Sequence, residues 1–232
     1  STSNISTLST SQLSALNASQ FQALTASQVG SLTSNQFNSL SQESLQAIDA
    51  GDVAALATGT VSNISTTQLQ RLTTTQIQAL TTAEIRALKT SQLSQLLTNQ
   101  IAALSTADIS ALTTAQLSSI SSDQLLALDT SQIKSLGSSQ IQTLTTSQLN
   151  TLTTAQFQSI NSAALSTIST LNISKLSTTQ INNLTDTQLL AMTSSQIGGL
   201  STQQLGQLDG TRLSTLSANQ IKGLLTNQIT SL

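Results

Sequence analysis

Carboxylates are the only plausible acid or base groups in this sequence, because histidine, cysteine and tyrosine are all absent. Asp49 and Asp52 are the closest pair of acidic residues along the chain. Two carboxylates near one another can act as general acid and general base, so the hypothesis of a catalytic dyad rests on this pair. The missing residues exclude an imidazole base, a thiolate nucleophile and the common structural zinc sites.

The backbone that must position these carboxylates is a repeat. The chain divides into 29 copies of an eight-residue repeat, from Ser1 to Leu232, with no remainder. Position 5 of the repeat is always Ile, Leu, Val or Phe, and position 8 is always Leu, Ile or Met. Strict periodicity of this kind is the signature of a repeat architecture. We therefore predict one continuous array over residues 1–232, with positions 5 and 8 as its core.

The polar positions predict where each helix begins. Position 1 is Ser, Thr, Asn, Asp or Gly in 25 copies, and position 4 is Gln in 20. Ser or Thr followed three residues later by Gln is a capping box, in which each side chain binds the backbone N–H of the other residue. In residues 72–80, Thr73 is then the N-cap and Gln76 reaches back to it. Leu72 and Ile77 occupy the positions of a hydrophobic staple.

A new cap in every repeat predicts a new short helix in every repeat. One continuous helix would rotate its apolar stripe by about 80° per repeat, which spreads the stripe over the whole surface. The predicted fold class is therefore all-α, a solenoid of short N-capped helices coiled round an Ile/Leu core. A β-solenoid is the alternative, because Ser, Thr, Asn and Ile suit such folds, although positions 5 and 8 would lie on opposite faces of a strand.

Six of the nine acidic residues fall in the two columns that begin the helices. They are Asp49, Asp129 and Asp209 at position 1, and Asp52, Glu84 and Asp108 at position 4. Carboxylates there complement the positive end of a helix dipole, so a capping role is favoured over a catalytic dyad. Calcium binding is a weaker alternative, since no EF-hand or glycine-rich calcium motif occurs. We predict no catalytic, cofactor-binding or metal-binding residue, and no enzyme.

Basic residues are few and dispersed. Arg71, Arg86, Lys134 and Lys175 occupy positions 6 and 7, which we expect to face solvent. The net charge is −2 and no basic stripe exists, so nucleic acid is not an expected partner. No apolar stretch approaches the roughly 18 residues that span a bilayer, so membrane insertion is not expected.

Two stretches depart from the consensus. Residues 41–64 and 161–176 lose the Gln at position 4 but keep both apolar columns, so we interpret them as degenerate repeats and not as linkers. Small residues at position 7 should let successive layers approach closely. The capping box accounts for the spacing of the Gln column, and an interface built from a ladder of Gln side chains is the alternative.

The repeat resembles known octapeptide arrays. Residues 73–80 carry Ser/Thr-Thr-x-Gln-Ile/Leu-x-x-Leu, and residues 113–120 carry the same pattern with Ile120 at its last position. This unit resembles repeats of very large bacterial surface or secreted adhesin-like proteins. That resemblance covers the whole chain and implies an extracellular or cell-surface location. The wider pattern Leu-Thr-x-x-Gln-Ile-x-x-Leu is also similar to the helix start in TAL effector repeats. Their Pro, second helix and base-reading loop are missing, so this second likeness supports capped helices and not DNA binding.

An even array without a distinguished repeat favours a mechanical function. We predict a structural protein that forms a stalk, fibre or filament, with a cell-surface or matrix partner as a further expectation. Neither end carries an atypical polar capping repeat, so we expect its contacts to continue end to end with another copy or with neighbouring repeats in cis. The alternative is a binding module that uses its rows of Ser and Thr on a glycan, a surface or ice.

Overall fold

The computed structural model describes residues 5–232, and within that range the chain forms short helices joined by turns, without strands. The predicted all-α repeat solenoid is therefore confirmed, and the β-solenoid alternative is wrong. Contacts between residues divide the chain into two compact units, with the division between Ile120 and Ser121. This division falls between two repeats and leaves no repeat split.

The helices before this division are four to six residues long, and each lies in a separate repeat. They are α2 (Thr10–Ser14), α3 (Ala18–Gln22), α4 (Ala26–Gly30), α5 (Ser34–Asn38), α6 (Gln42–Ala47), α7 (Ala50–Val53), α8 (Thr58–Val61), α9 (Thr66–Arg71), α10 (Thr74–Ala79), α11 (Thr82–Ala87), α12 (Thr90–Leu93), α13 (Thr98–Ala102), α14 (Thr106–Ala111) and α15 (Thr114–Ser119).

The helices after the division follow the same plan. They are α16 (Ser122–Leu126), α17 (Thr130–Lys134), α18 (Ser138–Ile141), α19 (Thr146–Thr151), α20 (Thr154–Ser159), α21 (Ser162–Leu165), α22 (Thr170–Ser174), α23 (Thr178–Asn182), α24 (Asp186–Ala191), α25 (Ser194–Gly198), α26 (Thr202–Leu205), α27 (Gly210–Ser214), α28 (Ala218–Lys222) and α29 (Thr226–Ile229).

Every one of these helices begins at position 2 of its repeat, after an N-cap at position 1. In α10 the N-cap Thr73 has extended backbone angles, φ −67° and ψ 159°. Its hydroxyl accepts from the backbone N–H of Gln76 over 3.1 Å, and the Gln76 Oε1 accepts from the Thr73 N–H over 3.0 Å. The predicted capping box is thus present, and it satisfies N–H groups that a helix start otherwise leaves unpaired.

Each helix ends because the chain becomes extended again within the same repeat. Leu80 follows α10 with φ −58° and ψ 137°, and its N–H still donates to the carbonyl of Ile77 over 3.2 Å. Among residues 5–232 no residue has a positive φ, so these helix ends do not use the left-handed glycine cap common elsewhere. The apolar residue at position 8 therefore both fills the core and turns the chain toward the next N-cap.

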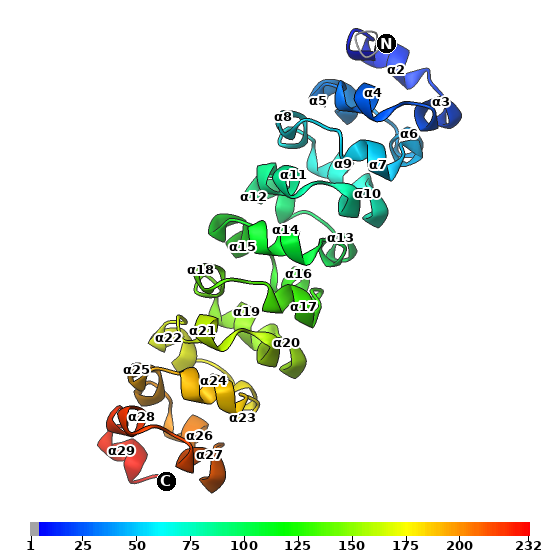
Figure 1. Cartoon of the computed structure of the whole chain (residues 1–232). Coiled ribbons are helices and arrows are strands. Elements are labelled where there is room, and N and C mark those ends of the chain that lie inside the picture. The colour runs from blue at the N-terminus through cyan, green and yellow to red at the C-terminus, as the bar shows by residue number, and fades with distance from the viewer. Residues whose placement is uncertain (1–4) are drawn as a thin grey trace. The chain divides into compact units, whose positions relative to one another are not determined.

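Successive layers stack with between three and four repeats per turn. Helices three apart in the chain pack against each other, as α7 does with α10 and α25 with α28 (Figure 1). The Gln46 amide donates to the carbonyl of Arg71, 25 residues later, and the Gln76 amide donates to that of Leu45, 31 residues earlier. These separations are just over three and just under four repeats. Each layer therefore contacts chain about one turn away.

The core consists of the two columns that the sequence predicts. Position 5 residues from Leu13 to Leu205 are at most 1% exposed, and position 8 residues from Leu32 to Leu208 are at most 4% exposed. The degenerate repeats keep this burial, for example at Val53 and Leu165. Residues 41–64 and 161–176 are thus repeats with the same core and different polar positions, as predicted.

Neighbouring helices approach closely where position 6 of one repeat meets position 7 of the repeat three later. A Cβ atom added to Gly30 in α4 would overlap the carbonyl oxygen of Ala55, which follows α7. A Cβ added to Gly198 in α25 would overlap the carbonyl oxygen of Gly223, which follows α28. The close approach expected at position 7 is therefore present at Ala55 and Gly223, and it excludes any side chain at the two position 6 glycines that face them.

Candidate functional site

The acidic residues at position 1 cap helices. The Asp129 carboxylate accepts from the backbone N–H of Gln132 over 2.8 Å, and that of Asp209 accepts from Arg212 over 2.9 Å. Asp49 accepts from the N–H of Gly51 over 2.8 Å, one residue earlier in the helix than the usual partner. The predicted capping role of these three aspartates is confirmed.

The acidic residues at position 4 behave less uniformly. Glu84 and Asp108 complete capping boxes, accepting from the N–H groups of Thr81 over 2.6 Å and Ser105 over 3.0 Å. Asp52 does not, and its predicted place in a capping box is wrong, because α7 starts with the shorter cap formed by Asp49. Within the described range no three acidic side chains gather as metal ligands would.

The Gln column has a second role that the capping box does not contain. The Nε2 of Gln76 donates to the backbone carbonyls of Leu45 and Ile48, both over 2.9 Å. Those carbonyls lie at positions 5 and 8 of the repeat four before that of Gln76. One buried amide therefore accepts at the start of its own helix and donates to the end of a helix in the preceding layer.

This contact recurs along both units. At least thirteen glutamines donate to the position 8 carbonyl four repeats earlier, over 2.5 to 3.3 Å; they are Gln36, Gln68, Gln76, Gln92, Gln100, Gln116, Gln156, Gln180, Gln188, Gln196, Gln204, Gln220 and Gln228. Carbonyls at helix ends lack partners within the helix, and leaving them buried and unpaired is costly. The Gln column supplies the missing donors.

Sequence reasoning missed this second role, although one signal of it is present. Glu serves a capping box as well as Gln does. Yet position 4 holds Gln in 20 copies and Glu only at Glu84. The amide accepts on one atom and donates on the other, whereas an ionised carboxylate can only accept. The preference for Gln over Glu therefore indicates a required donor, which the helix start alone does not explain. The predicted alternative of a Gln ladder differs from what is seen, since these amides bind backbone carbonyls.

Several substitutes at position 4 preserve the donor. Arg212 donates from its two terminal nitrogens to the carbonyls of Asn182 over 2.6 Å and Leu184 over 2.7 Å. The shorter Asn172 reaches one carbonyl, that of Leu144, over 3.2 Å. Donation between layers is therefore kept in repeats that have lost the capping box.

Asn at position 6 forms a second kind of link between layers. The Asn38 Oδ1 accepts from the N–H of Ser65 over 2.8 Å, and its Nδ2 donates to the carbonyl of Asn63 over 3.0 Å. Asn38 thus takes the place of Gln68 at the N-cap, and the Gln68 Oε1 instead accepts from Arg71 over 2.9 Å. Arg71 is half-buried, so its expected solvent position is wrong, because this amide oxygen is available to it. The other three, Arg86, Lys134 and Lys175, are exposed as expected.

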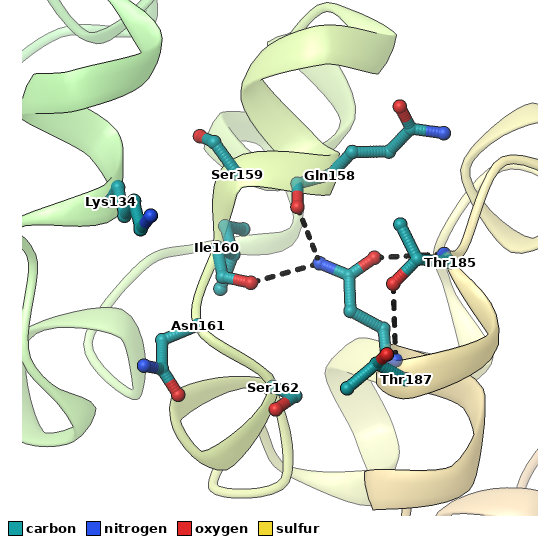
Figure 2. A pocket seen from close by; sticks show the side chains of 9 residues that line it. Lys134, Gln158, Ser159, Ile160, Asn161, Ser162, Thr185 and Thr187 are labelled. Atoms are coloured by element: carbon teal, nitrogen blue, oxygen red, sulfur yellow. Dashed lines mark hydrogen bonds between the residues drawn. The ribbon is translucent and has the colours of Figure 1, made fainter.

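A groove of about 340 Å³ opens on the second unit. Lys134, Asn161, Ser162, Thr185 and Thr187 are among the residues that line it (Figure 2). Gln188 also lines the groove, but its amide is already bonded to the N–H of Thr185 and to the carbonyl of Ile160. The groove therefore offers hydroxyl groups, one asparagine and one exposed ammonium group.

A search for membrane spans among residues 5–232 finds no helix with the length and apolar character that crossing a bilayer requires.

Comparisons with known proteins agree with the repeat seen in sequence and structure. Among curated proteins, none matches the chain. Three overlapping segments, residues 45–82, 77–106 and 101–138, match the family model of the ALTTAQ repeat. These segments include typical repeats as well as the degenerate ones from Leu45 onward. The chain is thus an array of eight-residue repeats that is similar to the ALTTAQ repeat over residues 45–138.

Proposed function

We propose that this array is a structural element, a stalk, fibre or filament segment at the bacterial cell surface or in the extracellular matrix, and that it has no enzymatic activity. The observation that carries the proposal is the recurrence of one contact between layers, from Gln36 in α5 to Gln228 in α29. A protein with one binding or catalytic site needs one repeat that differs in a chemically meaningful way. Where position 4 is not Gln, Arg212 and Asn172 still donate to carbonyls four repeats earlier.

The repeated contact suits a mechanical role because it does not depend on position in the array. At least thirteen position 4 glutamines bind the repeat four before theirs, so further repeats of this kind extend the stack with the same bonds. Those repeats can belong to the same chain or to a second copy that associates end to end. A surface or matrix component is the partner that such an extended element would hold in place.

A tandem duplication of the chain tests the architectural part of this proposal. Small-angle scattering should give the duplicated protein about twice the maximum dimension of the single chain, with an unchanged cross-section, because each repeat contacts only chain about one turn away. Gln100→Ala in the single chain is the control. Loss of one contact between layers should loosen the chain locally, without changing how its maximum dimension depends on the number of repeats. A particle that grows equally in all dimensions would contradict a stalk or fibre.

The location is tested separately. An antibody raised against residues 1–232 should label intact cells of the source organism, or their secreted matrix, without permeabilisation. Labelling that requires permeabilised cells would contradict the surface location. The architectural result would stand in that case, so the two parts of the proposal can fail independently.

A binding module is the second candidate, and the groove beside Lys134 is the observation that favours it. Hydroxyl groups of Ser162 and Thr187 with one ammonium group could bind a glycan that carries carboxylate or sulfate groups. Saturable binding on a glycan array that Lys134→Gln abolishes would support this function. The exposed Lys175, changed to Gln, is the matched control because it lies outside the groove.

A further inference from the structure

Glu84 is the only glutamate in the Gln column, and half of its carboxyl group lacks a partner. Its Oε2 accepts from the N–H and from the hydroxyl of Thr81, both over 2.6 Å. Its Oε1 is buried without a hydrogen bond, and the whole residue is 2% exposed. A buried and unpaired carboxylate oxygen is costly, so this atom requires an explanation.

The neighbouring repeats show what the unpaired oxygen faces. Gln76 donates from Nε2 to the carbonyls that lie 31 and 28 residues before it. The equivalent carbonyls for Glu84 belong to Val53 and Leu56. Because the Glu84 Oε2 makes the N-cap bond that an amide oxygen makes elsewhere, its Oε1 takes the place of the amide nitrogen. That place requires a donor, and an ionised carboxylate has none.

We propose that Glu84 is a carboxylic acid in the folded chain, and that its Oε1–H donates to the carbonyls of residues 53 and 56 as a reversible proton lock between the repeats 49–56 and 81–88. Protonation turns a contact between oxygen lone pairs into a hydrogen bond. The lock is closed when the proton is bound and is broken when the carboxyl group ionises. In the described repeats, the other position 4 residues that bind the equivalent carbonyls, such as Gln76 and Arg212, are permanent donors.

The charged groups around α11 do not offer Glu84 another partner. The helix α8 carries no titratable residue, and α14 carries Asp108, whose Oδ1 accepts from the hydroxyl of Thr82 over 2.8 Å. Asp52 lies on α7, next to Val53. Arg86 and Lys89 are both exposed, and the single ion pair found among residues 5–232 is elsewhere, between Arg212 and Asp186.

The electrostatics act in the direction that the lock requires. Burial raises the pKa of Glu84 above its ordinary value, against the opposing effect of the two bonds from Thr81. A carboxyl group whose pKa is raised by folding contributes stability that is fully present below its unfolded pKa. That stability is lost as the pH rises through the pKa of the folded state. The lock should therefore strengthen in mildly acidic solution and weaken toward alkaline pH.

Carboxyl NMR of the full chain tests the protonation directly. The sequence contains two glutamates, so labelling with ¹³C-glutamate gives two side-chain signals, of which the exposed Glu43 is the internal reference. We expect the Glu84 signal to titrate at a clearly higher pH than the Glu43 signal. Titration of both signals together, or of Glu84 at the lower pH, would overturn the proposal.

Two substitutions test the consequence for stability. Glu84→Gln installs a permanent donor, so its denaturation midpoint should exceed that of the unmodified chain at pH 8, with the difference shrinking at pH 4. Gln76→Glu should create a second proton lock, and its midpoint should fall from pH 4 to pH 8 relative to the unmodified chain. Glu43→Gln is the charge-matched control and should show no such dependence. Differences that are equal at the two pH values would overturn the lock.

Discussion

The side-chain nitrogen of Gln76 lies 2.9 Å from the backbone carbonyl oxygen of Leu45, a residue 31 positions earlier in the chain. The oxygen of the same amide accepts from the N–H of Thr73 over 3.0 Å. One side chain therefore pairs with a carbonyl at the end of a helix in one layer and with an N–H at the start of a helix in the next layer. This double use explains why position 4 is Gln in 20 of the 29 repeats.

Loss of this amide should cost more than loss of a surface glutamine. Gln76→Ala leaves two buried carbonyls and one N-cap N–H without their side-chain partner, so we expect a loss of about 2–4 kcal/mol in unfolding free energy. Gln78→Ala, in the same helix but exposed, is the control and should change stability little. Chemical denaturation monitored by circular dichroism measures both. Equal losses would show that the amide contact carries no stability.

The two core columns should be far less tolerant than the position between them. Ile77→Asn and Leu80→Asn each bury an amide at a site that is at most 4% exposed, so each should cost about 3 kcal/mol or more. Gln78→Asn should be nearly silent because Gln78 is exposed. Thermal denaturation of the three variants gives the comparison. Similar melting temperatures for all three would mean that the core is assigned wrongly.

The close approach of α25 and α28 predicts opposite effects for two glycines. Gly198→Ala should destabilise by about 1–3 kcal/mol, because its new methyl group would overlap the carbonyl oxygen of Gly223. Gly210→Ala, in a helix with open space around the new methyl group, should be stabilising by about 0.4–1 kcal/mol. Denaturation midpoints with opposite signs would support the packing, whereas a neutral Gly198→Ala would contradict it.

Restoring a missing cap should stabilise the array. Leu97 is an N-cap without a side-chain acceptor and is 45% exposed, while its N–H already donates to Gln100 Oε1 over 3.0 Å. Leu97→Thr completes the capping box, so we expect a gain of about 1 kcal/mol. Leu97→Ala separates this effect from loss of the exposed leucine. No difference between the Thr and Ala variants would contradict the capping explanation.

Local patterns in the sequence predict much of this fold. A helix start is predicted within five residues by Thr73, Gln76 and Ile77. The structure has that helix, and its capping box is present. The buried columns follow from the same eight-residue period. All of these features depend on residues close together in the chain, where spacing alone determines which groups can meet.

The features that sequence reasoning missed depend on how the turns stack. The carbonyls that bind the Gln76 amide lie 28 and 31 residues away. Predicting this contact requires the number of repeats per turn, which an eight-residue pattern does not determine. The half-buried position of Arg71 has the same origin. It depends on Asn38, 27 residues before Ser65, taking over an N-cap bond and releasing the Gln68 oxygen.

The hydrogen bond from a position 4 amide to the repeat four before it also limits how a gene that encodes this array can change length. If one whole repeat were deleted between residues 49 and 72, the amide of Gln76 would meet the carbonyls of Phe37 and Leu40 in place of those of Leu45 and Ile48. Those two carbonyls already bind the amide of Gln68 in the same way. Every partner is thus replaced by a chemical equivalent. Unequal recombination could add or remove whole octapeptides while each offspring array still folds, whereas the loss of a number of residues that is not a multiple of eight would misalign every amide beyond it.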